Sequence, residues 1–251
     1  MYEDIVVKQN NYRLNYKLKI YGITGDCPAL KLILNFIGHG GYCCCWFCYL
    51  KGEHIGNKRQ YYHQQQLVMR GTKQYSEESV KAEQKQTNIY GHLGKSILEN
   101  LLDVPLPQAI IIDYLHVTLL GLAKTIILSI YHQLIPIQRT QLDEQLKQQQ
   151  FPHFFNRKMR AVSNFAYVKA TELRNMLFYG ILPNLEPFLS NQQLSHLSLF
   201  ICAIRLLHSQ PTFGKATSQI ADQLFNQFYR DHNLYYTGLQ NFVLHLHAHY
   251  S

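Results

Sequence analysis

Residues 16–48 read YKLKIYGITGDCPALKLILNFIGHGGYCCCWFC, and this stretch decides the fold class. Apolar residues alternate with polar ones over residues 16–25, which predicts a β-strand. An acidic turn follows, and Pro28 then suits the first turn of a helix over residues 29–36. Glycines within residues 38–41 are expected to end that helix in a tight turn. The stretch therefore predicts a strand, an acidic turn, a helix and a loop rich in glycine and cysteine.

The rest of the chain favours helices. Residues 51–86 are polar without a clear period, and we expect an exposed insertion with a helix over residues 76–86. Residues 106–134 are strongly apolar and predict one long helix or two. Further helices are expected over residues 139–150, 167–179, 194–207, 220–233 and 237–248. The predicted fold class is α/β, mostly helical, in a single domain over residues 1-251.

Composition excludes two classes of protein. Apolar residues make up 47% of the 251 residues, which excludes a disordered chain. Six cysteines are too few for a miniprotein held together by disulfides. The net charge is +8, from 24 Lys and Arg against 16 Asp and Glu, and the isoelectric point is about 9.1. This charge is compatible with a polyanionic partner such as DNA, although many proteins of similar charge bind none.

Two further features indicate the compartment. Residues 1–11 are polar and lack the apolar segment of a signal peptide. Residues 109–135 are the most membrane-like stretch, but they carry Asp113, His116 and Lys124, which are costly in hydrocarbon. We expect a buried helix there and no membrane partner. Clustered cysteines in a chain without an export signal suggest a metal site or reduced thiols, and hence a nuclear or cytoplasmic location.

Cys45 and Cys48 form a C-x2-C pair, which can supply half of a structural zinc site. The other half must come from elsewhere in the chain, and histidine is the expected residue type. His116 and His39 are the first choices, with His245 next. The alternative is that the two cysteines pack as small buried hydrophobic residues.

Acidic residues provide further candidates. Asp113 and His116 are three residues apart and share one face of a helix, where they can orient a metal or form a polar pair in the core. Asp26 directly follows the predicted strand, and its alternative role is a helix cap. Glu172 lies in a predicted helix, and its alternative role is a solvated salt bridge with Lys169 or Arg174.

A basic patch is predicted in the insertion. Its members alternate with tyrosines and would contact DNA phosphates through charge: Lys51, Lys58, Arg59, Arg70 and Lys73. The alternative is a solvated loop without a partner.

Five short motifs occur in a fixed order. They are Gly25-Asp-Cys-Pro-Ala29, Ile37-Gly-His-Gly-Gly-Tyr42, Cys45-x2-Cys48, Ile112-Asp-Tyr-Leu-His-Val-Thr-Leu-Leu-Gly-Leu122 and Val168-Lys-Ala-Thr-Glu-Leu-Arg174. Together they resemble the core of transposases of the CACTA group, in particular the Tnp2-like transposase domain-containing proteins of animal genomes. The resemblance extends from residue 17 to about residue 246.

This resemblance implies an incomplete ribonuclease-H-like core, with its first strands missing and a large α-helical insertion. The core strand, acidic turn and cysteine pair would occupy residues 17-50, the insertion 51-165 and the C-terminal helices 166-251. The family's D-D-E carboxylates hold two Mg²⁺ ions for DNA strand transfer. Asp26 matches the second acid and Glu172 the third, while Cys45 and Cys48 match a pair thought to bind zinc.

The chain also departs from the family pattern. The family's first catalytic Asp lies well upstream of the acidic turn, where this sequence offers only Glu3 and Asp4. The family also has two histidines four residues apart near its C-terminal end. His245 matches the second of them, but Asn241 stands at the place of the first.

The expected function is therefore a truncated remnant of a transposase core that lacks strand-transfer activity, and an oligomer is compatible with it. The alternative is a zinc-supported basic helical module that binds DNA without cleaving it. A third hypothesis is a structural helical protein in which the motifs no longer have a function.

Overall fold

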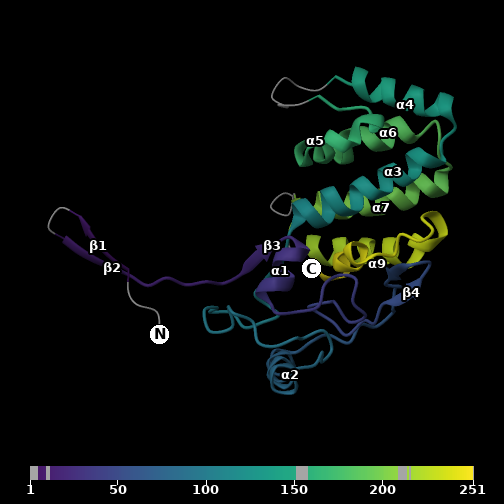
Figure 1. Cartoon of the computed structure of the whole chain (residues 1–251). Helices are drawn as coiled ribbons and strands as arrows, with labels where there is room; N and C mark the ends of the chain where they lie inside the picture. Colours follow the sequence, from purple (N-terminus) through teal and green to yellow (C-terminus); the bar gives the residue numbers. More distant parts are fainter. Residues whose placement is uncertain (1–4, 10–11, 151–157, 209–213, 215, 251) are drawn as a thin grey trace. The chain divides into compact units, whose positions relative to one another are not determined.

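A computed structural model describes residues 5–9, 12–150, 158–208, 214 and 216–250. The protein is mostly helical, with short strands that pair only in twos (Figure 1). The pairs are β1 (Ile5–Gln9) with β2 (Tyr12–Tyr16), β3 (Ile23–Gly25) with β6 (Ile110–Ile112), and β4 (Glu53–Ile55) with β5 (Lys58–Gln60). The mostly helical α/β class is thus confirmed. No sheet among the described residues exceeds two strands, so the ribonuclease-H-like core stays a prediction.

Residue contacts divide the chain into two compact units. Unit 1 comprises Met1–Tyr49 and Val68–Ile111, and unit 2 comprises Leu50–Leu67 and Ile112–Ser251. The single domain expected over residues 1-251 stays a prediction. Residues 50–67 belong to unit 2, where the Tyr61 amide donates to the Gln240 carbonyl over 2.6 Å.

Helix α1 (Cys27–Ile33) of unit 1 begins as its sequence predicts. Asp26 is the N-cap, its carboxylate accepts a hydrogen bond from the Ala29 amide (2.8 Å), and proline lies in the first turn. The helix ends earlier than the glycines suggested, because Asn35 adopts a left-handed conformation with φ of 49°. The second helix of the unit, α2 (Thr72–Lys85), covers most of the helix expected over residues 76–86.

The strand expected over residues 16–25 is mostly absent from the described structure. Only β3 remains beyond residue 16, and residues 17–22 form no ladder. Ile20 is instead held by Asp103, whose carboxylate accepts from the Ile20 amide (2.6 Å) and whose amide donates to the Ile20 carbonyl (2.8 Å). The Asp103 side chain thus accepts the hydrogen bond that the Ile20 amide would donate to a neighbouring strand.

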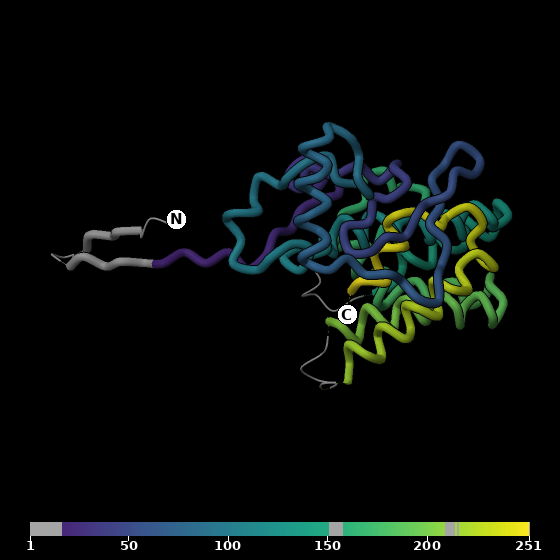
Figure 2. Tube along the Cα trace, turned by 90° about the horizontal axis from the view of Figure 1, so that it is seen from below, coloured from purple at the N-terminus to yellow at the C-terminus, as the bar shows by residue number. Residues whose placement is uncertain are grey.

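Unit 2 is built around apolar helices. The π-helix η1 (Tyr114–Ala123) continues into α3 (Lys124–Gln133), and both contribute to a core shared with α7 (Asn191–His208) and α9 (Thr217–Tyr235). Helices α7 and α9 run side by side (Figure 1 and Figure 2). The remaining elements are α4 (Pro136–Gln148), η2 (Val162–Tyr167), α5 (Ala170–Asn175), η3 (Met176–Gly180), α6 (Ile181–Leu185), α10 (Phe242–Leu246) and η4 (His247–His249).

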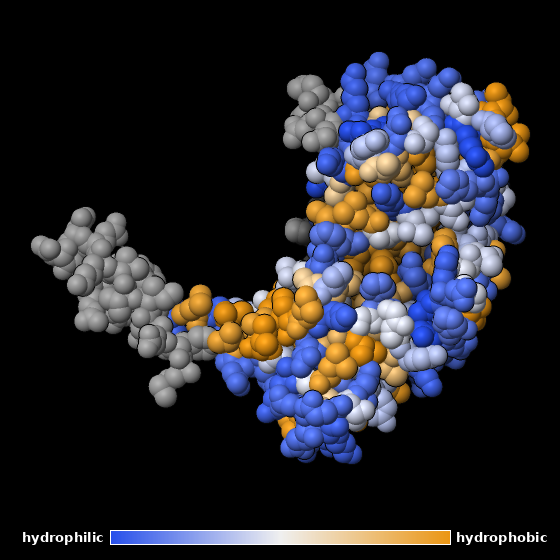
Figure 3. Space-filling view, in the orientation of Figure 1, coloured by the Kyte–Doolittle hydropathy of each residue, from blue (hydrophilic) through white to orange (hydrophobic). Residues whose placement is uncertain are grey.

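The apolar pattern predicts a helix from residue 106, but residues 110–112 form β6 instead. One helical stretch among the described residues, Tyr114–Gln133, is long and apolar enough to cross a membrane by length and composition alone. Its residues Leu122, Ile126 and Ile130 are buried in the core of unit 2. By contrast, mainly hydrophilic residues cover α2 and α4 (Figure 3).

Candidate metal centre

The C-x2-C turn of unit 1 is buried and is held at its C-terminal end by backbone hydrogen bonds. Cys45 and Cys48 are 0% exposed. Residues 47–49 pair with residues 68–70 through two backbone hydrogen bonds of 2.8 and 3.0 Å. Burial raises the pKa of the Cys45 thiol well above its ordinary value, and the hydrogen bond with Cys48 adds to the shift. Without a metal, the Cys45 thiol therefore stays protonated at neutral pH.

His245 and His249 lie one helical turn apart in the segment formed by α10 and η4. The Asn241 side chain caps α10 by accepting from the amide three residues later (2.9 Å). Residues four apart lie on the same face of a helix, so the two rings approach each other. His247 is bonded elsewhere, because its Nε2 lies 3.1 Å from the Thr118 hydroxyl. His247 therefore lies in a different environment from His245 and His249.

Aromatic residues of unit 2 surround His245. The Tyr61 ring stacks on it, with 6.0 Å between the centroids and 19° between the planes. Tyr61 is itself buried and fixed by its backbone, which donates to Gln240 and accepts from the Tyr229 hydroxyl. This packing limits the orientations that the His245 ring can adopt.

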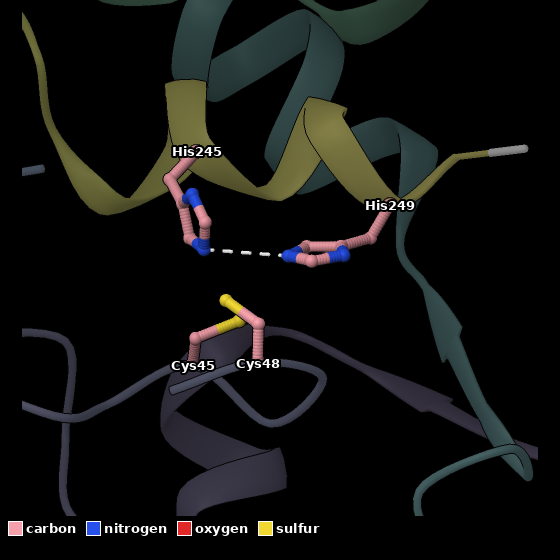
Figure 4. Close-up of side chains that lie close together, drawn as sticks. All are labelled: Cys45, Cys48, His245 and His249. Atoms are coloured by element: carbon pink, nitrogen blue, oxygen red, sulfur yellow. Dashed lines mark hydrogen bonds between the residues drawn. The ribbon is translucent and has the colours of Figure 1, made fainter. Parts of the chain in front are cut away.

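Cys45, Cys48, His245 and His249 form a group whose ligand atoms all lie within 4.8 Å of one another (Figure 4). The Nε2 atoms of His245 and His249 are 3.3 Å apart. Two nitrogen ligands about 2.0–2.1 Å from a tetrahedral ion lie about 3.3–3.4 Å apart, and zinc–sulfur distances of about 2.3 Å place two thiolates about 3.8 Å apart. The group can therefore bind a metal such as Zn²⁺.

Among the residues described, this is the group with metal-ligand potential, and it contains both predicted cysteines. His245 is the third of the histidines expected as remaining ligands, and His249 is not among them. The signal was present as a spacing of four between His245 and His249. The family resemblance instead matches His245 to the second histidine of such a pair, with Asn241 at the place of the first.

The first two histidine choices are not members of the group. His116 is exposed, and its Nδ1 lies 2.6 Å from an oxygen of Asp113. The other Asp113 oxygen accepts from the backbone amides of Leu115 and His116, so Asp113 caps η1. Partial burial alone would raise the pKa of Asp113, but the hydrogen bonds with His116 hold it below its usual value. His39 is exposed, and its carbonyl accepts from the Cys44 thiol over 3.8 Å.

The two predicted catalytic acids have partners within their own units. In unit 1 Asp26 caps α1, which was its alternative role. In unit 2 Glu172 is buried, and both of its oxygens lie 3.1 Å from Nε of Arg160. One of these oxygens also accepts from the Lys169 amide over 2.8 Å. Among the described residues, Glu172 thus forms an ion pair with Arg160, where the sequence suggested Lys169 or Arg174. A Mg²⁺ site shared by the two acids stays a prediction.

Four of the five predicted DNA-contacting residues reach the surface. Lys51, Lys58 and Lys73 are exposed, and Arg59 is partly exposed. Arg70 is only 3% exposed, which removes it from the predicted patch. The reason is that its guanidinium is used inside unit 1 as a hydrogen-bond donor.

The chain was compared with known proteins at the level of families, sequences and folds. No family model, no curated protein and no solved structure matches it.

Proposed function

We propose that this chain is a zinc-stabilised domain derived from the core of a CACTA-group transposase. The observation that carries the proposal is the group of Cys45, Cys48, His245 and His249. Two thiolates and two imidazoles make up a common ligand set for structural zinc. Three of the four residues are buried and the fourth is partly buried, as suits a closed site.

The proposed role of the metal is structural. Four protein ligands complete a tetrahedral shell and leave no position for a substrate or a reactive water. The cysteine pair and the histidine pair are also nearly 200 residues apart along the chain. A metal bound by both pairs closes a long loop, which stabilises the folded protein over the unfolded chain.

The ancestry rests on motif order and on ligand spacing. The five motifs are quoted above, and the two histidines with the family's spacing of four are His245 and His249. Under this proposal the pair corresponds to the family's two histidines, in place of the match of His245 with Asn241. A ribonuclease-H-like core with a helical insertion is the arrangement that this ancestry implies.

We propose that strand transfer is an ancestral activity that this chain does not carry out. Two-metal catalysis needs carboxylate oxygens that are available to Mg²⁺. Both oxygens of Glu172 instead face Arg160, and one of them also caps α5. Incubation with supercoiled DNA and Mg²⁺ should leave the DNA intact. Cleavage that is abolished by Asp26→Ala would contradict this part of the proposal.

Metal content tests the zinc centre. The full chain, purified without chelators, should contain one zinc ion per molecule by mass spectrometry of the metals. Cys45→Ser should lose most of that zinc and melt at a lower temperature. Cys202→Ser is the matched control, because Cys202 is an exposed thiol outside the group. A wild-type protein without stoichiometric zinc would refute the centre, as would a Cys45→Ser variant that keeps it.

DNA binding without cleavage is the second candidate, and the β4–β5 hairpin favours it. Gly56 and Asn57 both have positive φ at the tip, which makes a tight turn. Lys58 and Arg59 follow the tip, and Lys51 precedes the hairpin. These cations belong to one short segment of unit 2 and resemble a phosphate-contacting strip.

Salt dependence tests this candidate. Fluorescence anisotropy with a duplex should show an affinity that falls steeply with salt, by about 0.9 in log–log slope for each phosphate contacted. The triple variant Lys51→Gln, Lys58→Gln, Arg59→Gln should lower that slope. Lys73→Gln, on α2 of the other unit, is the control. An equal slope for the wild type and the triple variant would exclude the hairpin as the contact.

A further inference from the structure

Arg70 contacts both cysteines of the C-x2-C turn through a single donor. Its side chain is 0% exposed. Its Nε donates to the carbonyl of Cys45 and to the carbonyl of Cys48, each over 3.1 Å. One N–H group thus joins the first and last residues of the turn, which fixes the distance between their backbones.

The other guanidinium nitrogens hold Arg70 in place. Nη1 lies 3.1 Å from a carboxylate oxygen of Glu78, and Nη2 donates to the Tyr90 carbonyl over 2.6 Å. The guanidinium carbon lies 4.3 Å from the centre of the Tyr49 ring and 5.3 Å from that of Phe36. The hydrogen bonds and the two nearby aromatic rings together leave the Arg70 guanidinium little freedom to move.

Glu78 joins the same contacts from α2. Its second oxygen accepts from the hydroxyl of Tyr49, the residue after Cys48, over 2.8 Å. Glu78 also balances the charge of Arg70, so the ion pair carries no net charge. The effect of Arg70 on the cysteines is therefore one of geometry more than of charge.

We propose that Arg70 is the positioning residue of the metal centre, because it shapes the C-x2-C turn before a metal binds. This inference rests on the zinc centre proposed above. A turn held by its carbonyls presents both thiols at a preset separation, so less ordering is needed when the ion arrives. Residues that orient ligands in this way typically change metal affinity by about 10–100-fold when replaced.

Lysine is the informative replacement. It keeps the positive charge, but an ammonium group lacks the planar fork that reaches two carbonyls, Glu78 and Tyr90 together. In Arg70→Lys, we expect zinc affinity to fall by about 10–100-fold. Tyr49→Phe is the matched control, because it removes one hydroxyl of the same cluster and leaves every Arg70 hydrogen bond in place. Its zinc affinity should stay close to that of the wild type.

The experiment is a competition with a coloured chelator on the full chain, together with Co²⁺ substitution. The thiolate-to-cobalt absorption reports the geometry around the ion, which a general loss of stability does not change. Arg70→Lys should shift or broaden this absorption and should also reduce the rise in melting temperature that zinc produces. Glu78→Gln, which keeps Arg70 and loosens its anchor, should show a smaller fall in affinity.

The outcomes separate the two proposals. A wild-type protein that binds no zinc refutes the zinc centre itself. A wild-type protein that binds zinc, with an Arg70→Lys variant of equal affinity and an unchanged cobalt spectrum, refutes the positioning role alone. If Arg70→Lys does not fold, Glu78→Gln decides: weakened zinc binding with a normal fold supports the role, and wild-type affinity overturns it.

Discussion

The Nε2 atoms of His245 and His249 lie 3.3 Å apart across one helical turn. This separation equals the nitrogen–nitrogen distance of a tetrahedral zinc site and exceeds the usual distance of about 2.9–3.0 Å for an N–H hydrogen bond. Binding of an ion to both atoms requires that both Nε2 atoms be deprotonated, with the proton of each neutral ring on Nδ1. The helical backbone thus places the imidazoles of His245 and His249 on one face, where both can bind the same ion.

Replacing His249 should remove zinc, whereas replacing His116 should not. His249→Asn takes away one of four ligands, and we expect zinc affinity to fall by at least about 100-fold, because the three remaining groups do not complete the shell. His116→Asn is the matched control, since that ring is exposed and bonded to Asp113. Metal analysis of both variants after dialysis makes the comparison. Zinc loss in His116→Asn and not in His249→Asn would reverse the ligand assignment.

Zinc binding should release protons from the cysteines. In the metal-free protein, burial raises the pKa of the Cys45 thiol, so a proton must leave before sulfur can bind the ion. Calorimetry in buffers of different ionisation enthalpy should give about two protons released per zinc at pH 7. Affinity should then rise by about tenfold per pH unit for each proton released. Affinity that is independent of pH between 6 and 8 would show that the thiols are not ligands.

Local sequence signals predicted half of the metal centre and the start of α1. Asp26 and Pro28 mark the beginning of that helix within four residues, and Cys45 and Cys48 form a pair that is visible in sequence. The histidine half could not be inferred by spacing from the cysteines, because it lies nearly 200 residues away along the chain. Only the fold selects among the 13 histidines.

The partners of two charged residues, Arg70 and Glu172, could likewise not be predicted from the neighbouring sequence. Arg70 follows a polar, basic stretch, and the sequence predicted a solvent-facing cation. Its burial depends on Glu78 and Tyr90, which lie 8 and 20 residues further along the chain. The sequence suggests that Glu172 pairs with Lys169 or Arg174 close by, whereas its partner Arg160 lies 10 residues before the start of α5. Buried charges find partners in three dimensions, and sequence proximity does not identify them.

The role of Asp26 as a helix cap can be separated from a role in binding Mg²⁺. Asp26→Ala removes the acceptor for the Ala29 amide and should lower the free energy of unfolding by about 1 kcal/mol. Asp26→Asn keeps a capping oxygen and should cost only a few tenths of a kcal/mol. Urea unfolding of the two variants gives the comparison. The measurement is made with and without Mg²⁺, and an extra loss in Asp26→Asn that occurs only with Mg²⁺ would indicate a metal-binding role.

Acid sensitivity should depend on His232 in α9. Its side chain is fully buried, neither ring nitrogen has a hydrogen-bond partner among the described residues, and burial lowers its pKa to about 3. In the unfolded chain its pKa is about 6.5, so between pH 6.5 and 3 the unfolded state binds a proton that the folded state does not. Stability is therefore complete above pH 6.5 and falls with decreasing pH, by about 1.4 kcal/mol per pH unit for this group.

His232→Leu should remove that contribution, because leucine fills a similar volume without a titrating group. At pH 5 the variant should gain about 2 kcal/mol over the wild type relative to the difference at pH 8. Urea unfolding at pH 5 and pH 8 measures both differences, with His132→Gln as the control, since His132 is exposed. A stability difference between His232→Leu and wild type that does not change from pH 8 to pH 5 would mean that His232 titrates normally in the folded protein.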